Sequence, residues 1–297
     1  MLGLLGILGA MVAGLAMDSG SSSREAEDDP EETPEHEAFG VSSTAFLGFD
    51  DEGEGSDSGG TEPDGQPVSD DTPDPADPDQ TRSGSAGADQ MISGSDHDRL
   101  EALAGDDYLD GGLGDDSLVA GAGQDLVHGG AGHDMLAGGD GDDSLWGDAD
   151  NDLLTGGAGD DRLIGGMGHD SLAGEGGNDT LWGADPTGDD GAVDFLNGGA
   201  GDDRLHLGAG DCGHGGEGID TFTLQDFGPG AALAQITDFN PAEDDLVVIY
   251  DSTLHPDPQL SLQETAGNKL LLLDGVPLAS LTAGAGVDLS AIRLQAA

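Results

Sequence analysis

Residues 111–146 decide the fold. They read GGLGDDSLV, AGAGQDLVH, GGAGHDMLA and GGDGDDSLW, which are consecutive blocks of nine residues. The shared pattern is G-G-x-G-x-D-x-U-x, in which U is a large apolar residue. Self-similarity at a short fixed period indicates a repeat architecture, so it takes precedence over the helix or strand propensity of single segments.

The nonapeptide array extends from Gly84 to Thr223. Unbroken copies begin at Gly111, Gly129, Gly138, Gly156, Gly165 and Gly198, and looser copies begin at Gly84, Ser93, Ala102, Ala120, Gly147 and Gly174. The copy that begins at Gly183 has six extra residues before its aspartate. The copy that begins at Leu207 is one residue short, so we expect Cys212 in its aspartate position and His214 in its apolar position.

Each nonapeptide predicts one turn followed by one short strand. Glycines at the first, second and fourth positions permit the positive φ angles of a tight turn, and D-x-U-x gives an extended segment with one inward apolar side chain. Successive strands then lie on opposite sides of a flattened coil, which stacks at about 4.8 Å on the next coil. The sequence therefore predicts an all-β fold, a right-handed parallel β-roll over residues 83–223.

The inside of this roll is predicted to be one ladder of apolar side chains. It consists of Met91, Leu100, Leu109, Leu118, Val127, Leu136, Leu145, Leu154, Leu163, Leu172, Leu181, Leu196, Leu205 and Phe222. A core one side chain thick gains little against roughly 1.5 kcal/mol of ordering entropy per residue, and glycine makes that entropy larger. Another source of stability is needed.

The sixth position supplies candidate metal ligands. Its aspartates are Asp89, Asp98, Asp107, Asp116, Asp125, Asp134, Asp143, Asp152, Asp161, Asp170, Asp179, Asp194, Asp203 and Asp220. In a stacked roll they converge in two columns of turns, where they repel each other without a cation. Calcium accepts six to eight oxygen ligands, whereas magnesium demands a stricter octahedron. We therefore predict that these aspartates bind Ca²⁺.

The repeat resembles the hemolysin-type calcium-binding repeat of repeats-in-toxin (RTX) proteins over about residues 84 to 223. The resemblance implies that calcium lies between turns two copies apart, held by the sixth-position aspartate and by backbone carbonyls. Fifteen turns in columns of eight and seven leave at most about 13 spaces for ions.

The region before the array is acidic. The chain has 62 Asp and Glu against 7 Lys and Arg, a net charge of −55, so a nucleic-acid partner is not expected. Residues 18–82 are predicted to be a disordered linker, in which apolar spots near Phe39 and Phe46 to Phe49 are either docking segments or part of a spacer. Residues 1–17 are apolar and leave three interpretations open: a membrane anchor, a signal, or an apolar start with neither role.

Residues 224–297 are predicted to form a small β cap. Strands are expected at Leu246 to Tyr250, Lys269 to Leu273 and Val276 to Leu281, and Asp274-Gly275 predicts a hairpin turn between the last two. Pro277 is expected to place the returning strand at an edge. The stretch from Ile236 to Pro241, followed by Asp244 to Val247, resembles the region after the repeats in proteins exported by type I secretion. That resemblance implies a C-terminal, uncleaved export signal and the type I machinery as a partner. The alternative is a capping segment with no role in export.

Catalysis is not expected. The chain contains no H-E-x-x-H zinc helix, no G-x-S-x-G elbow and no phosphate-cradling Gly-Lys-Ser/Thr. His97, His133 and His169 fall at the fifth, variable turn position, and His206 falls at the ninth; all four are predicted to be exposed turn residues. The expected function is that of a secreted, non-enzymatic calcium-binding protein whose roll folds after export. The alternative is a surface protein anchored by residues 1–17.

Three apolar residues are predicted to form a stripe on the outside of the roll. Trp146, Ile164 and Trp182 share the ninth repeat position and are spaced by 18 residues, so they stack on one face. Such a stripe predicts either a partner surface or packing against the C-terminal segment.

Overall fold

The computed structural model describes residues 79–186, 188–225, 230–265, 268–282 and 287–297. The predicted N-terminal segment 1–17 and residues 18–78 of the predicted linker lie outside these residues. The predicted linker boundary at residue 82 is wrong, because Thr81 and Arg82 already pair with Arg99 and Leu100 as a first strand. Across the described residues the secondary structure consists of β-strands and one short 3-10 turn, η2 (Leu289–Ala291).

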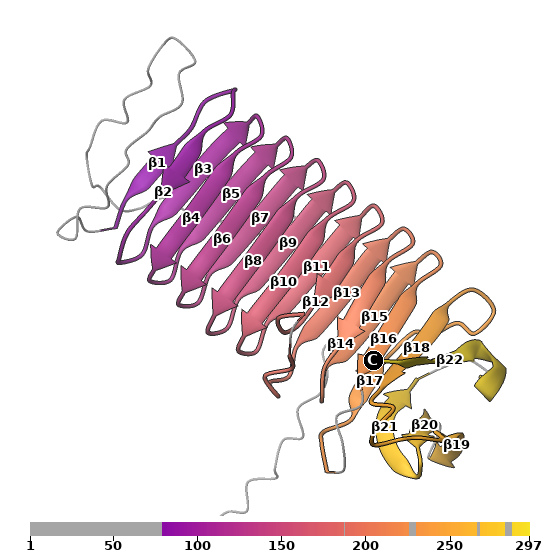
Figure 1. Ribbon diagram of the computed structural model, residues 1–297. Coiled ribbons are helices and arrows are strands. Elements are labelled where there is room, and N and C mark those ends of the chain that lie inside the picture. The colour runs from indigo at the N-terminus through magenta and orange to yellow at the C-terminus, as the bar shows by residue number, and fades with distance from the viewer. Residues whose placement is uncertain (1–78, 187, 226–229, 266–267, 283–286) are drawn as a thin grey trace, which may run out of the picture. The chain divides into compact units, whose positions relative to one another are not determined.

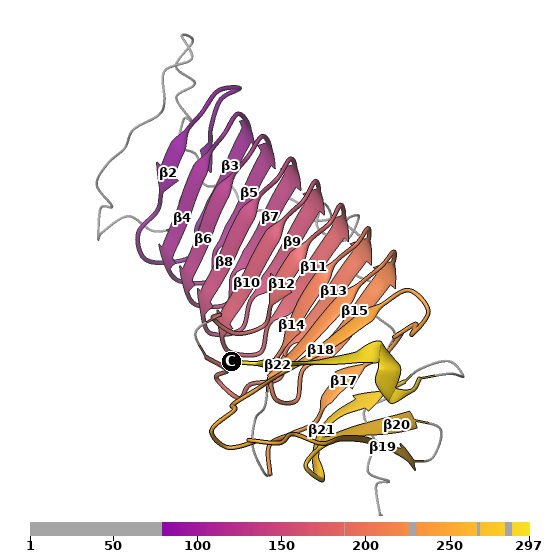
Figure 2. The same ribbon diagram turned by 45° about the vertical axis from the view of Figure 1, so that its right-hand side comes forward.

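Two sheets face each other (Figures 1 and 2). Sheet A contains, in spatial order, β1 (Thr81–Ser83), β3 (Arg99–Ala104), β5 (Ser117–Ala122), β7 (Met135–Asp140), β9 (Leu153–Ala158), β11 (Ser171–Gly176), β13 (Phe195–Ala200), β15 (Cys212–Glu217), β17 (Ala234–Ile236), β21 (Val276–Leu281), β20 (Asn268–Leu273) and β19 (Leu260–Thr265). Sheet B contains β2 (Gln90–Ile92), β4 (Tyr108–Leu113), β6 (Leu126–Ala131), β8 (Ser144–Ala149), β10 (Arg162–Met167), β12 (Thr180–Trp182), β14 (Arg204–Leu207), β16 (Thr221–Gln225), β18 (Asp245–Tyr250) and β22 (Ile292–Ala296).

Each strand of the array pairs in parallel with the strand two copies away. In sheet A, Leu118 of β5 is opposite Leu136 of β7, and in sheet B, Val127 of β6 is opposite Leu145 of β8. These partners are 18 residues apart, which is two nonapeptides per coil. The predicted parallel β-roll is therefore confirmed.

The predicted ladder forms the core. Every one of its side chains, from Met91 to Phe222, is at most 1% exposed. The six extra residues of the Gly183 copy do not shift the ladder, because Leu172 of β11 is opposite Leu196 of β13 although they are 24 residues apart. The insertion lies between the end of β12 and the start of β13. The six additional residues therefore lie in a turn, and the register of the strands on either side is unchanged.

The short copy is arranged differently from the prediction. Asp211 takes the aspartate position, because its Oδ1 accepts the backbone N–H of Asp194 at 3.0 Å. Cys212 then begins β15, and Gly213, not His214, takes the apolar position. The expectation that Cys212 replaces the aspartate and His214 the apolar residue is wrong by one residue, because the missing residue belongs to the turn before Asp211.

Leu207 fills the space that Gly213 leaves in the ladder. A Cβ atom on Gly213 would lie 2.9 Å from Cδ1 of Leu207, and Leu207 is 2% exposed. The core therefore stays continuous through the irregular copy.

The region after Thr223 continues both sheets. In sheet B, β18 pairs with β16 and β22 pairs with β18, all in parallel. In sheet A, β17 pairs in parallel with β15 on one side and with β21 on the other. The ring of Phe239 packs edge-on against Phe222, with ring centroids 6.1 Å apart, so the core also continues past the last repeat.

The predicted hairpin is confirmed, but the position predicted for Pro277 is wrong. Strands β20 and β21 are antiparallel and are joined at Asp274 and Gly275. Strand β21 lies inside sheet A, between β17 and β20, and β19 is the edge strand. Pro277 is tolerated there because it lies at a register shift opposite Leu272 and near the strand start, while β17 pairs only from Ala279 onward.

Candidate metal centre

The sixth-position aspartates form two columns along the edges of the roll. Column A, which precedes the strands of sheet A, contains Asp98, Asp116, Asp134, Asp152, Asp170, Asp194 and Asp211. Column B, which precedes the strands of sheet B, contains Asp89, Asp107, Asp125, Asp143, Asp161, Asp179, Asp203, Asp220 and Asp244. All are at most 8% exposed.

The structure brings every predicted aspartate into these columns and adds two residues. Asp211 was missed because the short copy was aligned one residue late. Asp244 was missed because no glycine-rich turn precedes it, although Asp220 donates its backbone N–H to Asp244 Oδ1 at 3.1 Å. Eight spaces separate the nine carboxylates of column B, and six separate the seven of column A. This is one space more than the sequence predicted.

One carboxylate oxygen of each aspartate links adjacent coils. Asp116 Oδ1 accepts the backbone N–H of Asp98 at 2.7 Å, and Asp134 Oδ1 accepts that of Asp116 at 2.8 Å. The same bond repeats along both columns at 2.7–3.1 Å. Asparagine could make this bond as well, so the bond alone does not explain why the repeat uses an acid.

The other carboxylate oxygen has no hydrogen-bond donor in ten of the inner turns. The buried Oδ2 atoms without a partner are those of Asp107, Asp116, Asp125, Asp134, Asp143, Asp152, Asp161, Asp170, Asp179 and Asp203. A buried charged oxygen without a partner costs a large desolvation free energy. These oxygens therefore need a positive partner that protein donors do not supply.

Backbone carbonyls approach the same oxygens. A Cβ atom on Gly111 would lie 2.5 Å from Asp116 Oδ2 and 2.6 Å from the carbonyl oxygen of Gly129 in the next coil. Gly138 has the same surroundings, at 2.3 Å from Asp143 Oδ2 and 2.8 Å from the Gly156 carbonyl. The first glycine of the repeat thus leaves a cradle where a carboxylate and a carbonyl oxygen converge.

Burial disfavours the ionised form of these carboxylates. It raises the pKa of Asp152, Asp161 and Asp194 to about 8, and that of Asp107 and Asp116 to about 6. The hydrogen bond from the neighbouring backbone N–H opposes the rise, while other carboxylates of the column add to it. The ionised column therefore requires a counter-charge near pH 7.

The end turns satisfy their own carboxylates. Asp89 Oδ2 accepts the N–H of Ser85 at 2.5 Å, and Asp244 Oδ2 accepts that of Asn240 at 2.7 Å. The inner turns, whose Oδ2 atoms have no donor, are therefore the ones whose residues fit a cation.

The donor set consists of carboxylate and carbonyl oxygens. In the part of the chain that the structure describes, no group of three or more His, Cys, Asp or Glu side chains is placed to hold a metal ion. Each inner turn contributes one carboxylate and its neighbouring carbonyls. Hard cations with many oxygen ligands, calcium above all, accept this chemistry.

The fifth repeat position has a role that the sequence analysis missed. Asp115 donates its N–H to Nδ1 of His97 at 2.8 Å, and its Oδ1 accepts the N–H of His133 at 2.9 Å. Further along, Asp160 Oδ1 accepts the N–H of Asn178 at 2.8 Å. The predicted exposure of His97, His133 and His169 is confirmed, but the fifth position is not freely variable. Its frequent Asp, Asn and His are short side chains with an acceptor, and that composition was the available signal. The exposure prediction is wrong for His206, which lies in strand β14 and is partly buried, because it stacks on Trp182.

Comparisons with known proteins agree with the repeat. The family described as RTX calcium-binding nonapeptide repeat (4 copies) matches residues 83–118, 110–145, 137–172, 146–181 and 188–211. No curated protein matches the chain. Among solved structures, the chain is similar to the extracellular lipase LipA from Serratia marcescens, at 19% identity over 72% of this chain and 40% of that chain, with a TM-score of 0.22. That likeness is too weak to support an argument about function.

Proposed function

This chain carries RTX calcium-binding nonapeptide repeats folded as a parallel β-roll, and on that premise we propose that it is a secreted, non-enzymatic protein whose roll becomes ordered when calcium binds after export. The observation that carries the proposal is the run of ten buried aspartate oxygens without a donor. Their spacing follows the repeat, so one explanation applies to all of them.

The two carboxylate oxygens of each inner aspartate have different roles in the proposed ion site. Oδ1 of each inner aspartate fixes the carboxylate to the neighbouring coil, as in Asp125 to Asp143 at 2.9 Å. Oδ2 and the first-glycine carbonyl of the next coil face the space between turns. When bound there, calcium supplies the positive charge that offsets burial and carboxylate repulsion. Its binding free energy then becomes folding free energy.

Calcium dependence would keep the roll unfolded inside the cell and let it fold outside. Extracellular calcium modules bind in the range of about 0.1 to 1 mM, so the scarce calcium of a cytosol would leave such sites empty and outside calcium would fill them. A net charge of −55 also disfavours collapse of the metal-free chain. We propose that residues beyond Thr223 carry the type I export signal in addition to continuing the roll.

The second candidate is a surface protein anchored through residues 1–17, which lie outside the described residues. Across the part that the structure describes, no helix is both long and apolar enough to span a bilayer. The apolar sequence of residues 1–17 is the observation that favours this candidate.

Cell fractionation separates the two candidates. With calcium in the medium, we expect the intact chain in the culture supernatant of the cells that make it, with its N-terminus present by mass spectrometry. Removal of residues 237–297 should keep the chain inside the cell. Recovery of the protein in the membrane pellet, released only by detergent, would contradict export and support anchoring.

A further inference from the structure

The outer face of sheet B differs in charge from the rest of the chain. Its ninth-position row runs through His128, Trp146, Ile164, Trp182, His206 and Thr223, and its seventh-position row through Leu126, Ser144, Arg162, Thr180, Arg204 and Thr221. Between these limits neither row contains an acid, although the chain carries 62 of them. The next members of the two rows are acids, Asp110 beside His128 and Asp245 beside Thr221. Beside these rows, Asp148 Oδ2 lies 3.1 Å from Nδ1 of His128.

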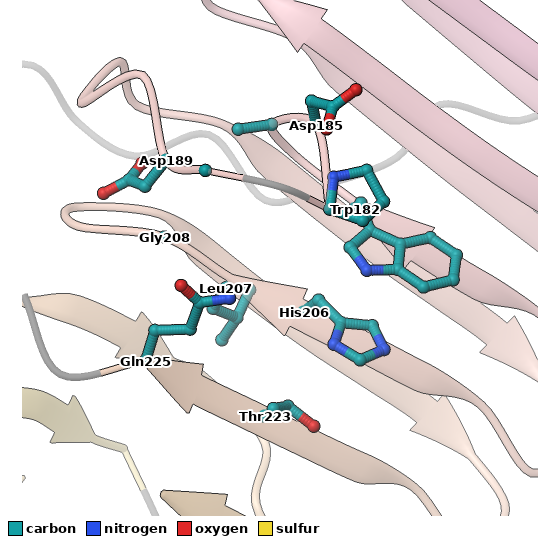
Figure 3. Close-up of a pocket in the computed structure, with 11 residues that line it drawn as sticks. Trp182, Asp185, Asp189, His206, Leu207, Gly208, Thr223 and Gln225 are labelled. Carbon is teal, nitrogen blue, oxygen red and sulfur yellow. The ribbon is translucent and has the colours of Figure 1, made fainter. Parts of the chain in front are cut away.

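The rings of this face stack on one another along the roll. Trp182 and His206 are nearly parallel, with ring centroids 4.5 Å apart and 5° between their planes, and Figure 3 shows them side by side on β12 and β14. The Arg162 guanidinium lies 4.1 Å from the Trp182 ring centroid. Trp146 stacks on His128 at 4.8 Å. The flat faces of Trp146 and Trp182 are therefore in contact with His128, His206 and Arg162. The predicted stripe is a ridge that presents mainly the edges of these rings to a partner.

The ridge is apolar and is flanked by guanidinium groups. Ile164 is only 4% exposed, between Trp146 and Trp182 in the register of the sheet. Burial lowers the pKa of His206 to about 4, with Arg162 and Arg204 lowering it further, so this ring is neutral at pH 7. We call Trp146, Arg162, Ile164, Trp182, Arg204 and His206 the aromatic-basic face.

The C-terminal segment is not the occupant that this face requires. Strands β18 and β22 extend sheet B beyond β16, as Figure 2 shows. They continue the sheet at its end, so the alternative in which the C-terminal segment explains the stripe is not supported. A partner for this face should offer both apolar side chains and carboxylates.

We propose that the aromatic-basic face binds residues 46–52 of the same chain, Phe-Leu-Gly-Phe-Asp-Asp-Glu. This segment places two phenylalanines, Phe46 and Phe49, directly before three acids. The phenylalanines match the edges of the tryptophan ridge, and the acids match Arg162 and Arg204. Neighbouring strands are about 4.8 Å apart, so β10 and β14 hold their arginines roughly 10 Å from each other, a span that three or four extended residues cover.

The length of the intervening chain permits this contact. Residues 53–80 separate the segment from β1, and a randomly coiled chain of that length spans roughly 30 Å. Strands β8 to β14 lie three to six strand spacings from β2, which is about 14 to 29 Å along the roll. The linker ends at β1 in sheet A, so it must also cross the thickness of two stacked sheets, about 10 Å. The tethered segment is therefore present at an effective concentration near the millimolar range.

A tethered acidic segment suits this face better than a free polyanion. A free acidic polymer must approach a molecule with a net charge of −55, which repels it over about a Debye length. Residues 46–52 belong to the same chain, so the linker residues 53–80 limit how far they can be from the face. The two ligands share carboxylate chemistry, so the test has to distinguish them.

Tryptophan fluorescence reports on this face directly, because Trp146 and Trp182 are the only tryptophans of the chain. In calcium-loaded full-length protein we expect the Phe46→Ser, Phe49→Ser variant to show a red-shifted emission and roughly twofold stronger acrylamide quenching, as release of a weakly held tethered segment predicts. Phe39→Ser is the matched control, since it removes a linker phenylalanine outside the segment, and it should leave both values unchanged.

The reciprocal change tests the charges. Arg162→Gln with Arg204→Gln should raise quenching in the otherwise native chain but should have little further effect in the Phe46→Ser, Phe49→Ser background. Because the linker variant leaves every residue of the roll intact, its result stands even if the arginine variant folds poorly.

Three results would overturn the proposal. The first is identical quenching in the native chain and the Phe46→Ser, Phe49→Ser variant. The second is protection that disappears on dilution together with a dimer in sedimentation, which assigns the face to a second copy. The third is protection of the linker variant only when polygalacturonate is added, which assigns the face to an external polyanion.

Discussion

At the scale of single residues, Asp143 shows why the sixth position is an acid. Its Oδ1 accepts a backbone N–H, a bond that asparagine could also make, while its Oδ2 has no donor. Burial raises its pKa to about 7, so the ionised side chain is unfavourable in the metal-free roll and is needed only when a cation is present. The repeat therefore uses an acid at this position to bind the cation, since the hydrogen bond between turns does not require one.

Asp143→Asn should act in opposite directions with and without calcium. With calcium, loss of the charge should weaken binding at that turn about tenfold, or ~1.4 kcal/mol. In chelator, the variant should unfold at a higher temperature than the native chain, because the amide can donate to the Gly156 carbonyl that faces the same cradle. Calcium titration by calorimetry and thermal unfolding in chelator near pH 7, where Asp143 is still partly ionised, measure the two effects. At pH 5 the protonated carboxyl can donate the same bond, so the difference in chelator should shrink.

Asp89→Asn is the matched control for that experiment. Asp89 lies in the same column, but its Oδ2 accepts the N–H of Ser85. Both carboxylate oxygens of Asp89 accept from Ser85, Oδ2 from the N–H and Oδ1 from the hydroxyl, so replacing the carboxylate by an amide weakens existing bonds and should destabilise the roll in both conditions. Equal behaviour of the two variants would show that the orphaned oxygens have no special role.

At the scale of elements, the fifth-position side chains hold successive turns together by accepting backbone N–H groups. Asp160→Ala should lower the free energy of unfolding by about 1 kcal/mol in calcium, whereas Asp160→Asn should stay close to native because it keeps the acceptor for Asn178. Both changes remove the charge, so urea unfolding of the pair separates hydrogen bonding from electrostatics. Similar losses in both variants would mean that charge, not the acceptor, is what matters.

The sequence predicts the regular elements well, because a strict period leaves one register in which leucines face inward and aspartates face the turns. It does not place the irregular elements. A missing residue near Leu207 can be assigned to the turn or to the strand, and only packing of Leu207 over Gly213 decides between them. Asp244 joins its column through a turn at Asn240 that does not resemble the repeat. The bulge that accepts Pro277 depends on pairing with a distant strand.

At the scale of the whole molecule, protons and calcium should substitute for each other. The inner aspartates have a higher pKa in the folded roll than the unperturbed value of 3.8, from about 6 at Asp116 to about 8 at Asp152. The folded state therefore binds protons more tightly than the unfolded state. Stability from this source is complete below about pH 4 and is lost as the pH rises through 6 to 8.

In chelator, acidification from pH 8 to pH 4.5 should therefore increase β structure in far-UV circular dichroism, with a midpoint between pH 6 and 8. General relief of the −55 charge by exposed carboxylates would place the midpoint near pH 4 instead. A metal-free spectrum that does not change with pH would contradict the burial of ionised aspartates.

The most direct test of the whole account is far-UV circular dichroism of the full-length chain at pH 7.5 during a calcium titration, with magnesium as the control. We expect little β structure in excess chelator, a cooperative gain of β signal at about 0.1 to 1 mM calcium, and no comparable gain with magnesium. An equally strong β spectrum in excess chelator would contradict the claim that calcium makes this roll fold.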